Sequence, residues 1–204
     1  GLGDVYKRQQ IKQSLVTPIT PPNCPCSFED YIDNANETEH YGLELESFYQ
    51  AHDRLTFSLS VGYLKAEFSD YLRLTEGAGG TVIAEDLDGR NVANAPEYQF
   101  ALDTTFGITD NLTLWLQLEG RDQYFFSNRH DGQSTAYELL NGSLTYSIDS
   151  WEVALWSKNL ANANYYTRGF GSFGNDPRKG YVTEPYYQFG EPREIGVRAT
   201  YKIQ

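Results

Sequence analysis

The feature that most constrains the fold is a strict two-residue alternation of apolar and polar side chains near the C-terminus, in residues 194–203. The apolar set is Ile195, Val197, Ala199, Tyr201 and Ile203. The residues between them are Glu194, Gly196, Arg198, Thr200 and Lys202. Successive side chains of a β-strand point to opposite faces, whereas a helix would place Ile195 beside Arg198. The alternation therefore predicts a strand with one apolar and one polar face.

The same alternation recurs along most of the chain. It is found in residues 41–50, 55–63, 97–108, 112–126 and 140–148, in a segment that starts at Trp151, and more weakly in residues 10–16. Short connections separate some of these segments, at 51–54, 109–111 and 149–150. Long connections separate the others, at 17–38, 70–96, 129–135 and 161–192. The first long connection is predicted to be a loop because it contains four prolines, which a central strand does not tolerate.

This arrangement predicts an all-β fold, an antiparallel meander of about seven or eight long strands that forms the C-terminal part of a transmembrane β-barrel. Connections that are short at one end and long at the other are typical of outer-membrane barrels. Aromatic residues near strand ends fit the interfacial girdles of such barrels. Apolar–polar runs of twelve residues or more, as at 97–108 and 112–126, also exceed the ~5–6 residues of an ordinary globular strand. A soluble β-sandwich, which alternates in the same way, is the alternative.

The composition argues against two classes of protein, those that span a membrane with helices and those that bind nucleic acid. No apolar run approaches the ~20 residues that a membrane-spanning helix requires, so helical insertion is excluded. The mean hydropathy of −0.55 does not decide between a soluble protein and a barrel, because the alternating strands of a barrel average out as hydrophilic. With 16 basic and 28 acidic residues the net charge is −12. Nucleic-acid binding is therefore not expected, since no basic stripe is available to displace counterions from phosphates.

The two cysteines, Cys24 and Cys26, are too few for a disulfide framework. They have neither the further soft ligands of a metal site nor the spacing of a thioredoxin motif. A tight loop disulfide, or pairing with an upstream cysteine, remains open. Residues 1–9 resemble a translated sequencing-adapter string and are set apart from the fold, although a genuine strand is the alternative. These residues contain no export signal, so we expect any such signal to lie upstream.

Four motifs resemble the C-terminal barrel of TonB-dependent outer-membrane receptors in their order and spacing. They are residues 41–46 (YGLELE), 94–98 (NAPEY), 158–166 (KNLANANYY) and 190–196 (GEPREIG). The resemblance covers about residues 10–204 and implies the last seven or eight strands of a barrel that has twenty-two in the family. Two positions depart from the family pattern: Asn162 stands where an acidic residue is usual, and Ile203 where a terminal aromatic is usual, with Gln204 beyond it.

The resemblance implies an N-terminal plug and an energy-coupling box, and neither lies in these residues. It also implies the outer membrane of a Gram-negative bacterium, with membrane lipid, the TonB complex and an extracellular small ligand such as an iron complex as partners. Charged residues on the polar face are then expected to form a hydrated lumen wall; the alternative is the solvated face of a soluble sheet. They are Glu44, Glu46, Asp103, Glu119, Arg121, Glu152, Arg198 and Lys202.

The expected function is active uptake of a scarce ligand, with ferric siderophore, corrinoid and glycan all open. Candidate binding residues lie in the 161–192 connection, where flat aromatic and guanidinium side chains gather as in recognition surfaces. They are Tyr165, Tyr166, Arg168, Tyr186 and Tyr187. The alternative is that these aromatics pack the connection against its neighbours. A passive porin, or a small self-contained eight-stranded barrel, is the alternative function.

Enzymatic activity is not expected, and neither is a cofactor or a metal site. The carboxylates Glu44 and Glu46 have a spacing that acid–base catalysis can use, but on one face of one strand they fit a solvated or plug-facing wall better. The histidines His40, His52 and His130 lie near turns or loops, without a nucleophile motif beside them.

Overall fold

The structure, a computed structural model, describes residues 11–19, 27–35, 37–76, 81–173, 177–179 and 184–203. The chain divides into two compact units. The described part of the larger unit covers residues 42–64 and 93–203, with gaps, and that of the smaller unit covers residues 11–41 and 65–92, also with gaps. No helix among the described residues is long and apolar enough to cross a membrane.

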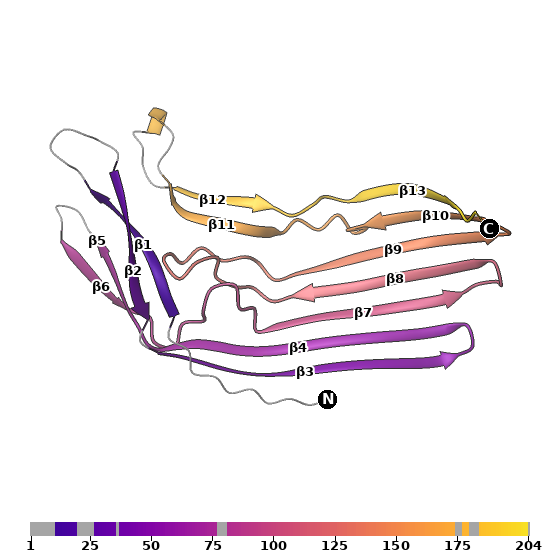
Figure 1. Ribbon diagram of the computed structural model, residues 1–204, viewed down its shortest axis with the longest axis horizontal. Helices are drawn as coiled ribbons and strands as arrows, with labels where there is room; N and C mark the ends of the chain where they lie inside the picture. Colours follow the sequence, from indigo (N-terminus) through magenta and orange to yellow (C-terminus); the bar gives the residue numbers. More distant parts are fainter. Residues whose placement is uncertain are drawn as a thin grey trace. The chain divides into compact units, whose positions relative to one another are not determined.

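A seven-stranded sheet dominates the fold, in the order β13-β10-β9-β8-β7-β4-β3 (Figure 1). Its strands are β3 (Glu37–His52), β4 (Leu55–Asp70), β7 (Tyr98–Gly107), β8 (Leu112–Arg121), β9 (Tyr137–Ile148), β10 (Trp151–Lys158) and β13 (Glu194–Tyr201). The neighbouring pairs from β4 to β13 are antiparallel. The predicted antiparallel meander is therefore confirmed.

The register of the sheet separates apolar and polar side chains into two faces. Leu59, Leu102, Leu118 and Leu140 are successive Cα partners across β4, β7, β8 and β9, and so form one apolar row. The neighbouring row, on the opposite face, contains Ser60, Ala101, Glu119 and Leu139. Because the side-chain period of a strand is two, a slip of one residue would exchange these faces. The alternation seen in the sequence thus sets the register.

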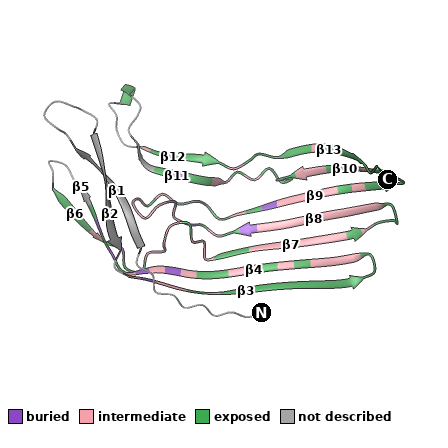
Figure 2. Ribbon diagram, in the orientation of Figure 1, coloured by how far each residue is buried: buried purple, intermediate pink, exposed green. Residues whose placement is uncertain are grey.

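The exposed fraction of the side chains shows how little of this sheet is covered. The central strands β7 and β8 are mostly half-buried, whereas β13 and much of β3 are exposed (Figure 2). On the apolar face Leu155 is 51% exposed, Ile195 63% and Val197 70%. Apolar surface of this kind marks a site of contact with a membrane or a partner.

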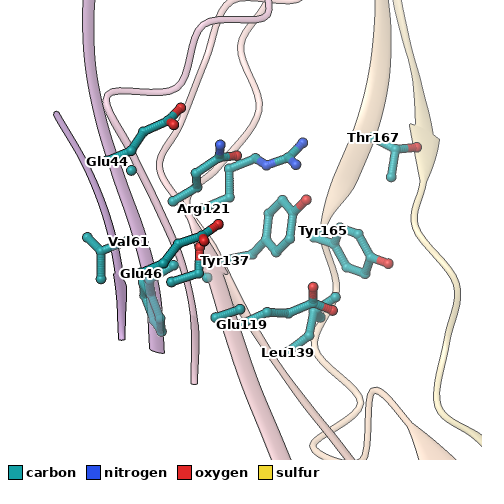
Figure 3. Close-up of a pocket in the computed structure, with 15 residues that line it drawn as sticks. Glu44, Glu46, Val61, Glu119, Arg121, Tyr137, Leu139, Tyr165 and Thr167 are labelled. Atoms are coloured by element: carbon teal, nitrogen blue, oxygen red, sulfur yellow. The ribbon is translucent and has the colours of Figure 1, made fainter. Parts of the chain in front are cut away.

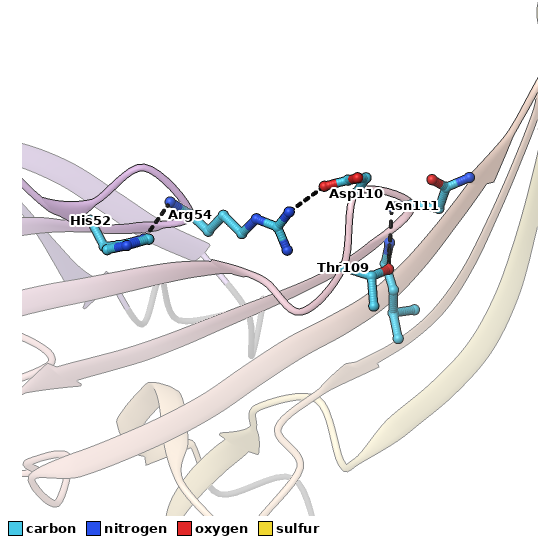
Figure 4. A network of polar contacts seen from close by, with 6 residues as sticks. His52, Arg54, Thr109, Asp110 and Asn111 are labelled. Atoms are coloured by element: carbon cyan, nitrogen blue, oxygen red, sulfur yellow. Dashed lines mark hydrogen bonds and ion pairs between the residues drawn. The ribbon is translucent and has the colours of Figure 1, made fainter.

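The three predicted short turns are confirmed. They lie at residues 53–54, 108–111 and 149–150, and Asp149 adopts a left-handed conformation with φ 51°. The first two turns are linked, because Arg54 forms an ion pair with Asp110 (Figure 4). Arg54 O also accepts a hydrogen bond from Gly107 N at 2.8 Å. Since both charged side chains are exposed, the ion pair contributes about 0–1 kcal/mol at most, and the backbone bond holds the turns together.

The prediction that three long connections are loops is wrong in part. The connections 70–96 and 161–192 each contain a two-stranded hairpin, and the connection 17–38 contains the second strand and the end of the first strand of another. The hairpins are β1 (Ile11–Ile19) with β2 (Ser27–Ala35), β5 (Leu72–Glu76) with β6 (Val82–Asp86), and β11 (Tyr166–Phe173) with β12 (Glu184–Phe189). A short 3-10 helix, η2 (Pro177–Lys179), follows β11. Pro18 is accommodated in β1, opposite Phe28, because a two-stranded sheet consists of edge strands only. Cys24, Cys26 and residues 1–9 lie outside the described residues.

One strand end also differs from the prediction. β8 stops at Arg121 rather than near residue 126. The backbone after it folds onto its own loop: Ser134 N donates to Tyr124 O at 2.9 Å and Phe126 N donates to Gly132 O at 3.0 Å. Those bonds replace the pairing that a longer β8 would have made. β4 ends at Asp70, where the predicted long connection begins. Next to this end, Phe68, Tyr71 and Leu87 form the buried cluster of the smaller unit.

Candidate ligand cavity on the polar face

A cavity of about 530 Å³ lies on the polar face of the larger unit (Figure 3). Strands β3, β8 and β9, the segment that leads into β11, and β11 itself supply most of its labelled side chains. These are Glu44, Glu46, Glu119, Arg121, Tyr137, Leu139, Tyr165 and Thr167, with Val61 from β4. Three carboxylates, one guanidinium and two phenol rings give the cavity both charged and flat aromatic surfaces.

Tyr165 is the aromatic centre of this cavity. Its ring lies 4.4 Å from that of Tyr137, centroid to centroid, at an interplanar angle of 35°. The Tyr165 ring also lies against Gly190, where any Cβ atom would overlap it. Gly190 N also donates a hydrogen bond to Tyr165 O at 2.9 Å. Tyr165 is thus held between β9 and the segment that leads into β13.

A chain of side-chain hydrogen bonds crosses the polar face below the cavity. Asp103 Oδ1 accepts from Trp115 Nε1 at 3.1 Å and from Gln117 Nε2 at 3.0 Å. Asn141 Nδ2 donates to Gln117 Oε1 at 3.1 Å and to Glu119 Oε1 at 3.0 Å. Such cross-strand pairs stabilise a sheet and fix side-chain orientation. The carboxylate of Glu119 is therefore oriented before any ligand arrives.

A second cavity, of about 680 Å³, adjoins the first and shares Glu119, Leu139 and Tyr165 with it. Its character differs, because its lining includes two indole rings and two cations: Trp115, Trp156, Lys158 and Arg198. Trp156 lies over Gly196 on the neighbouring strand, where a Cβ would overlap its ring. The two cavities together form a continuous polar and aromatic wall.

The charged residues that were predicted to share the polar face do lie on it wherever the strand register defines their face. Asp103, Glu119, Arg121, Glu152 and Arg198 all belong to the polar rows, and Glu44 and Glu46 line the first cavity. Lys202 follows β13, and its backbone N donates to Ser150 O at 2.8 Å.

The five predicted ligand residues do not converge on one site. Tyr165 lines both cavities. Tyr166 and Tyr187 pack on each other at 4.8 Å, and Tyr187 also contacts Phe126 at 6.0 Å. These two rings lie on one face of the β11–β12 hairpin and fasten it to the loop after β8.

Arg168 and Tyr186 lie on the opposite face of the hairpin, as the pairing of Arg168 with Gln188 and of Phe170 with Tyr186 shows. The Arg168 guanidinium lies 4.6 Å from the centroid of the Phe170 ring. Farther along the hairpin, the Glu184 carboxylate accepts a hydrogen bond from Lys179 Nζ at 2.7 Å. That bond raises the pKa of the exposed Lys179, so this ammonium stays charged at neutral pH.

Tyr137 and Asn141 are the site residues that sequence reasoning missed. Tyr137 precedes the segment 140–148 in which the alternation was recognised, yet β9 begins at this residue. The alternation does not extend back to it, because Leu139 and Tyr137 lie on the polar face and Glu138 on the apolar face, so periodicity alone would not have found it. Among the described residues, no group of three or more His, Cys, Asp or Glu side chains is arranged to hold a metal ion.

A family model described as the TonB-dependent receptor-like β-barrel matches residues 4–160. The chain belongs to the TonB-dependent receptor β-barrel family. TonB-dependent receptors are transporters of the Gram-negative outer membrane rather than enzymes, which agrees with the expectation that this chain is not catalytic.

Solved structures share the fold. The siderophore receptor PiuA from Acinetobacter baumannii has a TM-score of 0.66 at 19% identity, over 94% of this chain and 24% of the receptor. The ferric yersiniabactin uptake receptor FyuA from Yersinia pestis has a TM-score of 0.65 at 18% identity, over 84% of this chain and 24% of the receptor. The ferric citrate transporter FecA has a TM-score of 0.59 at 18% identity, over 81% of this chain and 24% of the transporter. This TonB-dependent receptor chain thus spans about a quarter of the length of the solved receptors that it matches.

Proposed function

We propose that residues 10–204 are the C-terminal barrel segment of an outer-membrane receptor that imports a scarce iron complex, such as a ferric siderophore, with energy supplied through TonB. The main observation that supports this proposal is the two-faced sheet. Its apolar face is exposed, and its polar face forms a cavity around Tyr165. The apolar face would contact lipid, and the polar face would line the lumen. TonB would act through parts of the receptor outside this chain.

The fold relatives support the iron-complex class, since the printed names of three of them refer to a siderophore, ferric yersiniabactin and ferric citrate. The cavity supports it chemically. Flat phenol rings at Tyr137 and Tyr165 offer stacking surfaces, and Arg121 offers donors to carboxylate or hydroxamate oxygens. Tyr166 and Tyr187 on one face of the hairpin, and Arg168 and Tyr186 on the other, are further proposed ligand contacts outside the cavity.

Growth of a strain that lacks the full-length receptor tests the transport function. The strain would be starved of iron and supplied with single ferric complexes, and in parallel with cobalamin or a glycan as the limiting nutrient. We expect growth to fail on one iron complex, and to fail in the same way when TonB is deleted. A strain that uses every nutrient normally but admits small hydrophilic solutes more slowly would identify a passive porin instead.

Tyr165→Ala in the full-length receptor should weaken binding of the complex found in that growth assay by about tenfold, because one aromatic contact at a binding site contributes roughly 1 kcal/mol or more. Titration of receptor fluorescence with the complex measures the affinity. The matched control is Tyr201→Ala, which removes a ring that packs on Trp151 at 5.0 Å and lines neither cavity. If both variants bound the complex with the same affinity as the wild type, Tyr165 would not be part of the binding site.

A further inference from the structure

The connection from β10 to β11 contains two asparagines in left-handed backbone conformations. Asn159 has φ 46° and Asn162 has φ 55°. This conformation costs most residues about 1–2 kcal/mol, and asparagine adopts it when its short side chain bonds to nearby backbone. Asn159 is only 3% exposed, so its polar side chain has to be satisfied by protein groups.

The side chain of Asn159 holds two separate backbone segments. Its Oδ1 accepts from Ala163 N at 2.8 Å, and its Nδ2 donates to Ala163 O at 2.9 Å and to Glu191 O at 3.0 Å. Ala163 lies two residues before Tyr165, and Glu191 directly follows Gly190, against which the Tyr165 ring lies. One side chain therefore fixes the backbone on both sides of the place where Tyr165 sits.

Asn159 is in turn fixed to the sheet. Its backbone N donates to Asn141 Oδ1 at 2.9 Å, and Asn141 Nδ2 donates to Glu119, which lines the same cavity as Tyr165. The hydrogen bonds thus run without interruption from the wall of the cavity to both ends of the β11–β12 hairpin.

We propose that Asn159 is a positioning residue, which sets the place of Tyr165 on the cavity wall by holding Ala163 and Glu191 together. The importance of Asn159 for ligand binding rests on the proposed function. The positioning of Tyr165 by Asn159 does not depend on that function, and it can be measured without a ligand.

Asn159→Asp keeps one bond to Ala163 and removes the donor that joins the two segments. Aspartate keeps the acceptor for Ala163 N, but it has no donor for Ala163 O or Glu191 O and turns a second oxygen toward these carbonyls. A nitroxide attached at Asn164→Cys, with the other cysteines replaced by serine, reports the motion of this segment by electron paramagnetic resonance. Asn164 is exposed. In the full-length receptor we expect the ratio of mobile to immobile label to rise about fivefold or more, as the net loss of two hydrogen bonds implies.

Asn162→Asp is the matched control, because it makes the same substitution at the other left-handed residue. Asn162 Oδ1 accepts from Arg193 N at 3.1 Å, and aspartate keeps that acceptor. The label should keep its wild-type spectrum in this variant. Asn159→Gly, which retains the backbone conformation and loses every side-chain bond, replaces Asn159→Asp if the latter does not give the heat-modifiable band of a folded barrel. A wild-type spectrum in a folded Asn159 variant, or an equal increase in the Asn162 control, would overturn the proposal.

Discussion

Leu59→Arg is expected to destabilise the full-length receptor in lipid by about 2–4 kcal/mol, the cost of arginine on the lipid face near the bilayer midplane. Leu59 belongs to the apolar row that continues through Leu102, Leu118 and Leu140. No polar side chain of this row could compensate for the new charge. Equilibrium unfolding in phospholipid vesicles, followed by heat-modifiable gel mobility, measures the change.

Ser60→Arg is the control for that experiment, since it places the same side chain one residue farther along the same strand. Ser60 lines the first cavity on the polar face, where water can solvate a guanidinium. Its effect should be well below that of Leu59→Arg. If the two variants unfolded at the same denaturant concentration, the assignment of the apolar face to lipid would be incorrect.

Gly120→Ala should have the second large effect, a loss of about 1–3 kcal/mol from overpacking. Gly120 is the Cα partner of Phe100, and a Cβ at this position would overlap the Phe100 ring. The ring would have to leave the place it occupies over the neighbouring strand. Denaturant unfolding of the full-length receptor in detergent gives the free-energy difference.

Gly62→Ala separates this overlap from the general effect of removing a glycine. A Cβ at Gly62 would lie 3.5 Å from Gln99 Cγ, an ordinary contact. This substitution should therefore be neutral or stabilise by about 0.4–1 kcal/mol, because it restricts the unfolded chain. A loss of stability at Gly62 as large as that at Gly120 would show that the Phe100 ring is not the cause.

The strands were predictable because most side chains in them obey a local rule. The period of two, read from Leu59 and its neighbours, fixes which face each residue occupies. The face on which Glu119 lies followed directly from that period. The short turn at 149–150 was visible because Asp149 and Ser150 interrupt two clear alternations.

The cavity was not predictable in the same way, because it depends on contacts between distant segments. Nothing local indicates that Tyr165 packs between Tyr137 and Gly190, which lie on other strands or connections. The hairpin β11–β12 was missed because glycine interrupts its alternation and its register contains irregularities between Tyr166 and Arg168 and between Phe170 and Phe173. The early end of β8 depends on backbone bonds between Tyr124 and Ser134, which no periodicity reveals.

The tight turns at 53–54, 108–111 and 149–150 have a consequence for how such a receptor can change over evolutionary time. An insertion in one of them would shift the pairing of two strands and turn leucines toward water. The connection between β10 and β13 carries no such restriction, because the hairpin it contains pairs with itself. New specificities can therefore arise by lengthening or rewriting that hairpin, while Asn159 and Gly190 keep its base in place and the sheet beneath stays the same.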